Sequence, residues 1–201
     1  MSRFQSAAIL AGGKSTRMGF DKQMLEVKGV RLMEQLIAQL KTRFPDVLVA
    51  SATPQLYNPQ EVRVIEDIYP GLGPLGGIHS ALVQAESPWV FVVACDMPYV
   101  ELPYIDYMRQ RLVTGEYQAC ATCREGRLEP FHAFYSSSSL PQLEADLAQG
   151  LYSVTRFLKK INTLIIPEEE AAPYVPGWRA FLNLNTPEEY RKFRGELGGA
   201  G

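Results

Sequence analysis

Cysteine and histidine are scarce in this sequence, with three cysteines and two histidines in 201 residues. A disulfide framework needs paired cysteines at a higher density, so we expect a fold without disulfides in a reducing compartment. Cys120 and Cys123 form a C-x-x-C pair, but zinc would need two further ligands, and Cys95, His79 and His132 are scattered along the chain. The sequence therefore predicts core thiols and structural histidines in place of a zinc site.

Long hydrophobic runs are absent as well. The longest uninterrupted run, residues 89–95, is far shorter than the roughly 20 residues that span a membrane. The N-terminal segment has one basic residue and an apolar run too short for a secretory signal. We therefore expect a soluble, cytoplasmic protein without a membrane anchor.

Neither sign of charge dominates, because 20 Lys and Arg stand against 22 Asp and Glu, for a net charge of −2. A dedicated DNA- or RNA-binding domain is usually strongly basic, so nucleic acid is not an expected partner. Hydrophobic residues make up 46% of the chain and charged residues 21%, which excludes a disordered protein. A mass of 22.5 kDa fits one domain with a sizeable core.

Short apolar runs, which predict strands, alternate with longer segments at helical spacing. The predicted strands are residues 6–11, 47–50, 62–65, 89–94, 117–123, 128–135, 163–166 and 181–184. The predicted helices are residues 31–44, 74–85, 103–113, 140–149, 154–160 and 187–197. Thr186, Pro187 and Glu189 form a capping box that predicts the start of the last helix. The alternation predicts an α/β fold, Rossmann-like and doubly wound, with a mostly parallel sheet and helices on both faces.

In such folds ligands bind beyond the carboxyl ends of the strands, and the first strand leads into a glycine-rich, basic loop. Adjacent glycines let a backbone pass close to a ligand with its amides exposed, and nearby cations neutralise an anion. The loop contains Gly12, Gly13, Lys14, Ser15, Thr16, Arg17 and Lys22. This combination predicts a polyphosphate-binding loop.

Two known phosphate-binding motifs compete for this interpretation. Residues 13–15 match the end of a P-loop, but its required first glycine falls at Ala8, inside the predicted strand. Residues 71–76 fit the dinucleotide fingerprint, with Asp96 twenty positions further on. However, residues 66–70 separate this turn from the preceding strand, and the fingerprint leaves the basic first loop unexplained.

A family resemblance accounts for more of the chain. The opening segment, Leu10-Ala-Gly-Gly-x-x-x-Arg17-Met18-Gly19-x-Asp21-Lys22, resembles the first motif of nucleotidyltransferases that activate sugars and cofactors. More narrowly, the chain is similar to the molybdenum cofactor guanylyltransferases, which join GMP to molybdopterin. The further matching segments are Glu66-Asp67, Gly73-Pro-Leu-Gly-Gly-Ile78, Cys95-Asp96-Met97-Pro98, Glu129-Pro130 and Asn183-Leu-Asn-Thr-Pro-Glu188.

The resemblance implies a single nucleotidyltransferase domain over residues 1–201. Its nucleotide-binding half would cover about residues 1–100 and its acceptor-binding half about residues 101–195, before a frayed tail at 196–201. In the implied reaction the terminal phosphate of molybdopterin, with or without molybdenum, attacks the α-phosphorus of GTP, and pyrophosphate leaves. Molybdoenzyme apoproteins or their chaperones would receive the product.

The resemblance also implies roles for individual residues. Arg17 and Lys22 would hold the triphosphate and the charge that develops on the leaving pyrophosphate. Asp96 follows the most apolar strand and is interpreted as the main Mg²⁺ ligand, between metal and α-phosphate. Mg²⁺ is thus the expected cofactor, and the sequence indicates no second carboxylate ligand for it.

Substrate-binding residues follow from the same resemblance. The implied GTP-binding set is Leu10, Ala11, Gly12, Gly13, Ser15, Thr16, Arg17, Lys22, Asp67, Pro74, Leu75, Gly76, Gly77 and Asp96. Asp67 would bind the nucleoside, and glycine at position 12 favours guanylyl transfer, since related cytidylyltransferases have alanine there. Asn183 and Asn185 are expected two apart on a strand, facing the same way, where they would bind the acceptor.

One departure from the family pattern weakens the guanine assignment. The family commonly has an asparagine that contacts the nucleotide after the strand at residues 47–50, and this chain has Ser51-Ala-Thr53 there. Ser51 or Thr53 could supply a hydrogen bond, but a neutral hydroxyl reads a base differently from an amide. Three alternatives therefore stay open. The chain could use CTP, it could use a sugar-phosphate acceptor, or it could be a GTP- or cofactor-binding carrier without catalytic activity.

Overall fold

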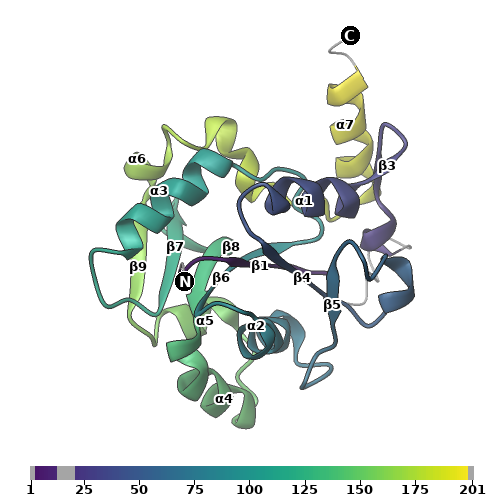
Figure 1. Cartoon of the computed structure of the whole chain (residues 1–201). Coiled ribbons are helices and arrows are strands. Elements are labelled where there is room, and N and C mark those ends of the chain that lie inside the picture. Colours follow the sequence, from purple (N-terminus) through teal and green to yellow (C-terminus); the bar gives the residue numbers. More distant parts are fainter. Residues whose placement is uncertain (1–2, 13–20, 199–201) are drawn as a thin grey trace.

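Strands from both halves of the sequence form one seven-stranded sheet (Figure 1). The computed structural model describes residues 3–12 and 21–198. The strands, in spatial order, are β5 (Arg63–Ile65), β4 (Asp46–Ala50), β1 (Ser6–Leu10), β6 (Trp89–Ala94), β8 (Arg127–Ser136), β7 (Ala119–Arg124) and β9 (Thr163–Pro167). Strand β8 is antiparallel to both neighbours, and the other pairs are parallel. The predicted mostly parallel α/β sheet is confirmed.

Strand order places a switch point at β1. The chain moves from β1 outward through β4 to β5 and then returns to the other side of β1 with β6. Ligands of open α/β sheets bind at such a reversal, beyond the carboxyl ends of the strands. The carboxyl ends of β1, β4 and β6 are therefore the place to look for a site.

Helices cover both faces of the sheet (Figure 1). One face carries α1 (Leu32–Lys41), α3 (Leu102–Leu112), α6 (Glu168–Ala171) and α7 (Pro187–Gly198), and the other carries α2 (Gly73–Gln84), α4 (Leu140–Ala148) and α5 (Val154–Leu158). Alternation along β1 divides the core: Ala7 and Ile9 pack on the first face, and Ala8 and Leu10 pack on the second. This double coverage explains why β1 is apolar throughout.

Short elements that the sequence did not reveal connect these layers. A small ribbon pairs β2 (Glu26–Val27) with β3 (Val30–Arg31), and 3-10 turns lie at Lys22–Met24 (η1), Pro54–Leu56 (η2), Ser137–Ser139 (η3) and Pro176–Phe181 (η4). The Tyr190 hydroxyl on α7 accepts from the Glu26 amide and donates to the Glu26 carbonyl. The C-terminal helix is thereby tied to the segment that follows Lys22.

The C-terminal capping box is confirmed. The Thr186 hydroxyl accepts from the Glu189 amide at 3.1 Å, and the Glu189 carboxylate accepts from the Thr186 amide at 2.9 Å. Helix α7 begins at Pro187, as these contacts require.

The predicted strand at residues 181–184 is wrong. Residues 176–181 form the turn η4, in which Gly177 and Trp178 both have positive φ. The segment after it pairs with no strand, because the Leu184 amide donates to the Asp96 carbonyl in a loop. Left-handed backbone at two successive residues redirects the chain away from the sheet edge, and apolar spacing alone does not reveal that.

The prediction of core thiols is confirmed for two of the three cysteines, and both histidines lie in the interior. Cys95 and Cys120 are buried, Cys123 is partly buried, and all three are free thiols. Both histidines are buried. Within residues 3–12 and 21–198, no three His, Cys, Asp or Glu side chains cluster as a metal site would require.

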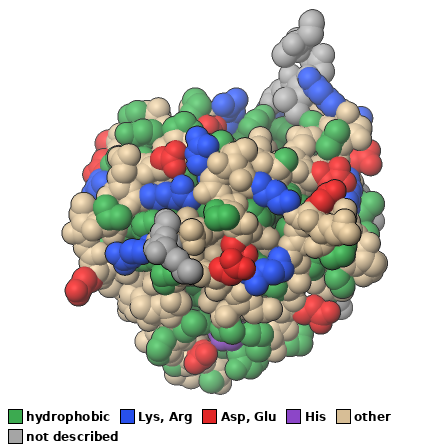
Figure 2. Space-filling model, viewed as in Figure 1, with side chains coloured by type: hydrophobic (Ala, Val, Ile, Leu, Met, Phe, Trp, Pro, Cys, Tyr) green, Lys and Arg blue, Asp and Glu red, His purple; other side chains and the backbone are tan. Residues whose placement is uncertain are grey.

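Surface charges of both signs are interspersed over the face drawn in Figure 2, in keeping with the small net charge. In the described part of the chain, no helix combines the length and hydropathy needed to cross a membrane.

Candidate active site

A pocket of about 540 Å³ lies beyond the carboxyl ends of β1 and β4. We call it the glycine-lined pocket; its lining residues are Leu10, Gly12, Ala50, Asp67, Gly71, Gly73, Pro74 and Gly77. Leu10 and Ala50 are the last residues of β1 and β4, and Pro74 and Gly77 belong to the first turns of α2. The pocket thus occupies the place that the strand order indicates for a ligand.

Missing side chains make this space. A Cβ at Gly77 would come within 3.2 Å of the Leu10 side chain and 3.7 Å of the Asp67 carboxylate, so alanine there would crowd the pocket wall. Gly71 and Gly73 have φ of +82° and +67°, a conformation that side chains rarely adopt. The wall is therefore bare backbone, whose amides and carbonyls can read a flat ligand at close range.

The first turn of α2 adds unsatisfied donors. Leu72 precedes the helix without a side-chain cap, so the free amides of the first turn need partners from elsewhere. The partial positive charge of this helix end favours an electron-rich ligand atom.

Asp67 is the one ionisable group among the described residues that line this pocket. Its carboxylate makes no hydrogen bond or ion pair with the other described residues, and burial raises the pKa of Asp67 above its usual value. A half-buried carboxylate without a partner is available to accept hydrogen bonds from a ligand donor.

The structure places part of the predicted GTP-binding set in this pocket: Leu10, Gly12, Asp67, Pro74 and Gly77. Ala11, Leu75 and Gly76 are buried beside it and do not line it. A Cβ at Gly76 would lie 3.1 Å from the Tyr69 carbonyl, so this glycine allows the turn to pack. Gly13, Ser15, Thr16 and Arg17 fall outside the described residues.

Sequence reasoning missed three lining residues, Ala50, Gly71 and Gly73. Ala50 carries no signal except that it ends a strand. The two glycines did carry one, since they start the segment that fits the dinucleotide fingerprint, and the structure gives that turn a place in the pocket wall.

A charged centre lies at the end of β6. The Lys22 ammonium is 2.6 Å from Asp96 Oδ2 and donates to Asn185 Oδ1 at 2.9 Å. These three residues, which we call the Lys22–Asp96–Asn185 centre, are far apart in sequence. The Cys95 amide donates to the carbonyl of Leu10, which lines the glycine-lined pocket, and Asp96 directly follows Cys95. Two predicted catalytic residues and one predicted acceptor-binding residue are thus brought together.

Lys22 is aimed by its neighbours in η1. Asp21 caps the turn by accepting from the Gln23 amide at 3.0 Å, and Gln23 Nε2 donates back to the same carboxylate. Gln23 is only 5% exposed, and its Oε1 accepts from three hydroxyls. The donors are Tyr57 at 2.6 Å, Ser51 at 2.8 Å and Thr53 at 3.3 Å. The buried amide anchors one side of the turn while Lys22 extends from the other.

This anchor shows what the hydroxyl residues at the position of the family's asparagine do in this chain. The sequence suggests Ser51 or Thr53 as a nucleotide contact, but their hydroxyls are directed to Gln23, and neither lines the glycine-lined pocket. Their role in this chain is to hold the Lys22 turn.

Asp96 is the described residue best suited to a metal ion. Its Oδ2 is bound to Lys22, and its Oδ1 makes no hydrogen bond with the other described residues. In the described part of the chain, no group of three or more His, Cys, Asp or Glu side chains forms a metal site around it. This donor set fits a cation that takes most of its ligands from phosphate and water, which is the habit of Mg²⁺.

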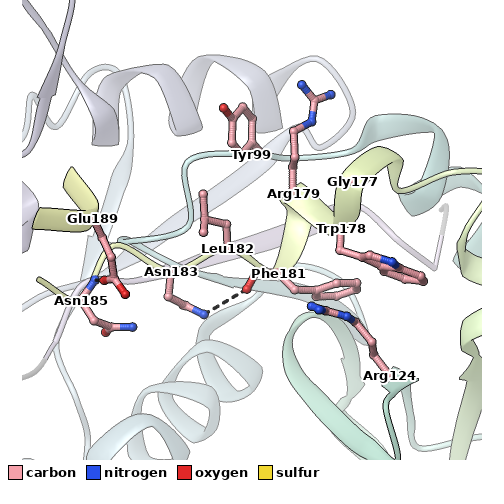
Figure 3. Close-up of a pocket in the computed structure, with 10 residues that line it drawn as sticks. All are labelled: Tyr99, Arg124, Gly177, Trp178, Arg179, Phe181, Leu182, Asn183, Asn185 and Glu189. Carbon is pink, nitrogen blue, oxygen red and sulfur yellow. Dashed lines mark hydrogen bonds between the residues drawn. The ribbon is translucent and has the colours of Figure 1, made fainter. Parts of the chain in front are cut away.

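A second pocket, of about 530 Å³, opens beside the same centre (Figure 3). We call it the arginine–aromatic pocket; it is lined by Tyr99, Arg124, Gly177, Trp178, Arg179, Phe181, Leu182, Asn183, Asn185 and Glu189. Asn183 and Asn185 lie near one another at one end of it (Figure 3). The prediction that they lie on a strand is wrong, because both follow η4 in irregular backbone. Asn183 Nδ2 donates to the Phe181 carbonyl, while the Asn185 side chain contacts Lys22.

Comparisons with known proteins show which family the chain belongs to. A family model described as a MobA-like NTP transferase domain matches residues 7–163. The molybdenum cofactor guanylyltransferase of Syntrophotalea carbinolica is 46% identical, over 99% of this chain and 95% of the relative. A probable molybdenum cofactor guanylyltransferase of Peptoclostridium acidaminophilum is 42% identical, over 94% of this chain and 88% of the relative.

A solved structure shares the fold. Molybdopterin-guanine dinucleotide biosynthesis protein A from Archaeoglobus fulgidus superimposes with a TM-score of 0.85 at 23% identity, covering 96% of this chain and 98% of that one. The extent and identity of these matches establish that the chain belongs to the MobA-like NTP transferase family of nucleotidyltransferases.

Proposed function

We propose that this protein transfers GMP from GTP to the terminal phosphate of molybdopterin and releases pyrophosphate. The observation that carries the proposal is the junction of two pockets at one charged centre. The glycine-lined pocket adjoins Asp96 through the Leu10–Cys95 hydrogen bond, and the arginine–aromatic pocket includes Asn185, which is bonded to Lys22. Such a junction suits the joining of two separately bound substrates. The curated relatives named as guanylyltransferases support the same reaction.

In this reaction an oxygen of the molybdopterin phosphate forms a bond to the α-phosphorus of GTP, and the bond from that phosphorus to the bridging oxygen breaks. Both reactants are anions, so positioning and charge neutralisation carry most of the catalysis. Lys22 lies at the junction, and its ammonium has three donors, of which two go to Asp96 and Asn185 and the third can bind a phosphate oxygen. Arg17, from the preceding basic loop, is proposed as the second cation on the triphosphate.

The glycine-lined pocket is proposed to hold the guanine nucleoside. A purine is flat and carries donors on its edge, which suits a wall of bare backbone and the unpartnered Asp67 carboxylate. The remaining predicted contacts with the triphosphate, from Gly13, Ser15 and Thr16, belong to the same proposal.

Mg²⁺ is the proposed cofactor, with Asp96 as its protein ligand. When bound, it would neutralise phosphate charge and orient the α-phosphate. The free Oδ1 of Asp96 supports this assignment. The acceptor phosphate is proposed to lie against Asn185, with Asn183 next to it.

The product would pass in the cytoplasm to molybdoenzyme apoproteins or their chaperones. Two rival functions make different demands on the site. A cytidylyltransferase would use the same centre with another base, and a carrier would bind the substrates without needing the Lys22–Asp96 pair.

The test is pyrophosphate release with molybdopterin and Mg²⁺, comparing GTP, CTP, ATP and UTP. We expect acceptor-dependent release with GTP alone. Release with CTP would move the protein to the cytidylyl branch. No release with any nucleotide, while molybdopterin still binds, would favour the carrier.

A further inference from the structure

The arginine–aromatic pocket contains more than phosphate transfer requires. Trp178, at the end opposite Asn185, has φ of 58° and follows Gly177 at 60° (Figure 3). A bulky residue rarely adopts left-handed backbone, and such strain is concentrated at functional sites. Here it brings a large aromatic side chain to the pocket wall, where the indole and the Phe181 ring stack at 6.2 Å.

Two guanidinium groups share the pocket with aromatic rings. Arg124 Cζ lies 5.4 Å from the centre of the Trp178 ring, and Arg179 Cζ lies 5.0 Å from the centre of the Tyr99 ring. Arg124 comes from the end of β7, and its Nε is buried without a hydrogen-bond partner among the described residues. Stacking on a ring leaves the edge donors of a guanidinium free for an electron-rich ligand atom.

The acidic groups nearby leave this cationic character largely in place. Glu129 interacts with Arg124, but burial is the larger effect and raises the pKa of Glu129, which disfavours its charged form. Glu189 accepts from the Asn185 and Thr186 amides as part of the helix cap. Glu101 approaches Arg179 only at 3.5 Å, and Glu125, the partner of Arg124, is 72% exposed, where an ion pair is weak.

We infer that this pocket binds the fused pterin ring of the acceptor, with Trp178 and Arg124 as specificity-determining residues. The inference rests on the proposed function, because the contact between Asn185 and Lys22 marks the end where the acceptor phosphate must lie. From there the pocket extends past Asn183 to Arg124 and Trp178 (Figure 3). A pterin has a flat face for the indole and ring oxygen and nitrogen acceptors for the guanidinium, and its dithiolene is anionic. A sugar phosphate has no such face.

Direct binding tests this without turnover. The protein has two tryptophans, and Trp89 is 1% exposed in the core. We expect 6-hydroxymethylpterin to quench the emission of Trp178, and the quenching to disappear in Trp178→Phe, which reports any effect on Trp89. Trp178→Ala and Arg124→Gln should each weaken pterin binding about tenfold. Saturable binding that both variants leave unchanged would overturn the assignment, and Arg124→Gln keeps the test open if Trp178→Ala fails to fold.

Steady-state kinetics separate this inference from the proposed function. In Trp178→Ala and Arg124→Gln, the KM for molybdopterin should rise about tenfold while the KM for GTP stays constant. The control is Tyr152→Ala, which removes an exposed aromatic ring that does not line the pocket. If wild-type protein transfers GMP and both variants keep the acceptor KM, the pocket assignment is wrong. If it transfers none but the pterin still quenches Trp178, the proposed function fails and the pocket assignment stands.

Discussion

The two pockets beside Lys22 and Asp96 are built by opposite means. The glycine-lined pocket lies at the ends of parallel strands and owes its space to missing side chains. The arginine–aromatic pocket lies on and after η4, partly in irregular backbone, and its walls are formed by large aromatic rings and guanidinium groups. The first is a recess that the strand order provides, and the second depends on the particular side chains on and after η4. We expect changes in the first to alter the nucleotide, and changes in the second to alter the acceptor.

The largest effect should come from the centre that both pockets share. Asp96→Asn keeps the shape of the side chain and removes the charge that pairs with Lys22 and would hold Mg²⁺. We expect kcat to fall about 100- to 1,000-fold, the usual cost of losing one electrostatic contribution to a transition state. The measurement is single-turnover GMP transfer at saturating substrates.

Asp106→Asn is the matched control, since this carboxylate is 41% exposed and pairs with arginines remote from the centre. It should leave kcat unchanged. Full turnover by a folded Asp96→Asn protein would show that the charged centre is not where the two substrates meet.

Acid should have opposite effects on the stability contributed by one buried group near each pocket, His132 and Asp67. His132 is buried, accepts from the Glu101 amide through Nε2 and packs edge-on against Phe181 beneath the arginine–aromatic pocket. Burial lowers the pKa of His132 from 6.5 to about 4. The unfolded chain therefore binds this proton more tightly, so its contribution to stability is present above pH 6.5 and is lost as pH falls towards 4. The shift corresponds to about 3 kcal/mol.

Denaturant unfolding at pH 7 and pH 4.5 measures this loss. His132→Asn should flatten that part of the pH dependence, and asparagine tolerates the left-handed backbone at this position, where φ is 56°. Asp67 acts in the opposite sense, because burial raises its pKa and its contribution falls as pH rises. Asp67→Asn should therefore leave the acid loss intact. Identical acid profiles for wild type and His132→Asn would contradict the assignment.

An intermediate effect is expected where the turn that holds Lys22 is anchored. Gln23→Leu leaves the hydroxyls of Ser51, Thr53 and Tyr57 without their shared acceptor and frees the turn to move. Small displacements of a catalytic group are costly, so we expect kcat to fall between about 10- and 100-fold. Single-turnover transfer measures it.

A double-mutant cycle shows whether Gln23 acts through Lys22. In a Lys22→Met background, Gln23→Leu should cost no further activity, because the group it positions is already gone. Additive losses would mean that Gln23 merely stabilises the fold. Thermal unfolding of both single variants controls for that general loss.

The regular half of this architecture was predictable and the irregular half was not. Apolar runs such as Trp89–Ala94 have one explanation, a strand covered on both faces, and the structure confirms it. Asp96 was placed correctly after the end of a strand, and Lys22 was placed in the segment that follows the first strand. The segment at 181–184 looked like a strand because it is a short, mostly apolar run, while its path depends on backbone angles at Gly177 and Trp178. Likewise, the partners of Gln23 come from a distant loop, and local spacing contains no trace of them.

The smallest expected effect comes from adding one methyl group at Gly12, and it tests most directly whether the two pockets bind different substrates. A Cβ at Gly12 would meet only the Asp67 carboxylate, at 4.0 Å, among the described residues, so Gly12→Ala should fold normally. The methyl group would take up room inside the glycine-lined pocket, where we expect it to disfavour a purine over the smaller pyrimidine. We expect kcat/KM for GTP relative to CTP to fall about tenfold, the usual discrimination from one added carbon. Gly195→Ala, on α7 with open space around it, is the control.

Because the arginine–aromatic pocket is separate, the KM for molybdopterin should stay constant. If it rose together with the KM for GTP, the two pockets would be one continuous site, and the division between nucleotide side and acceptor side would be wrong.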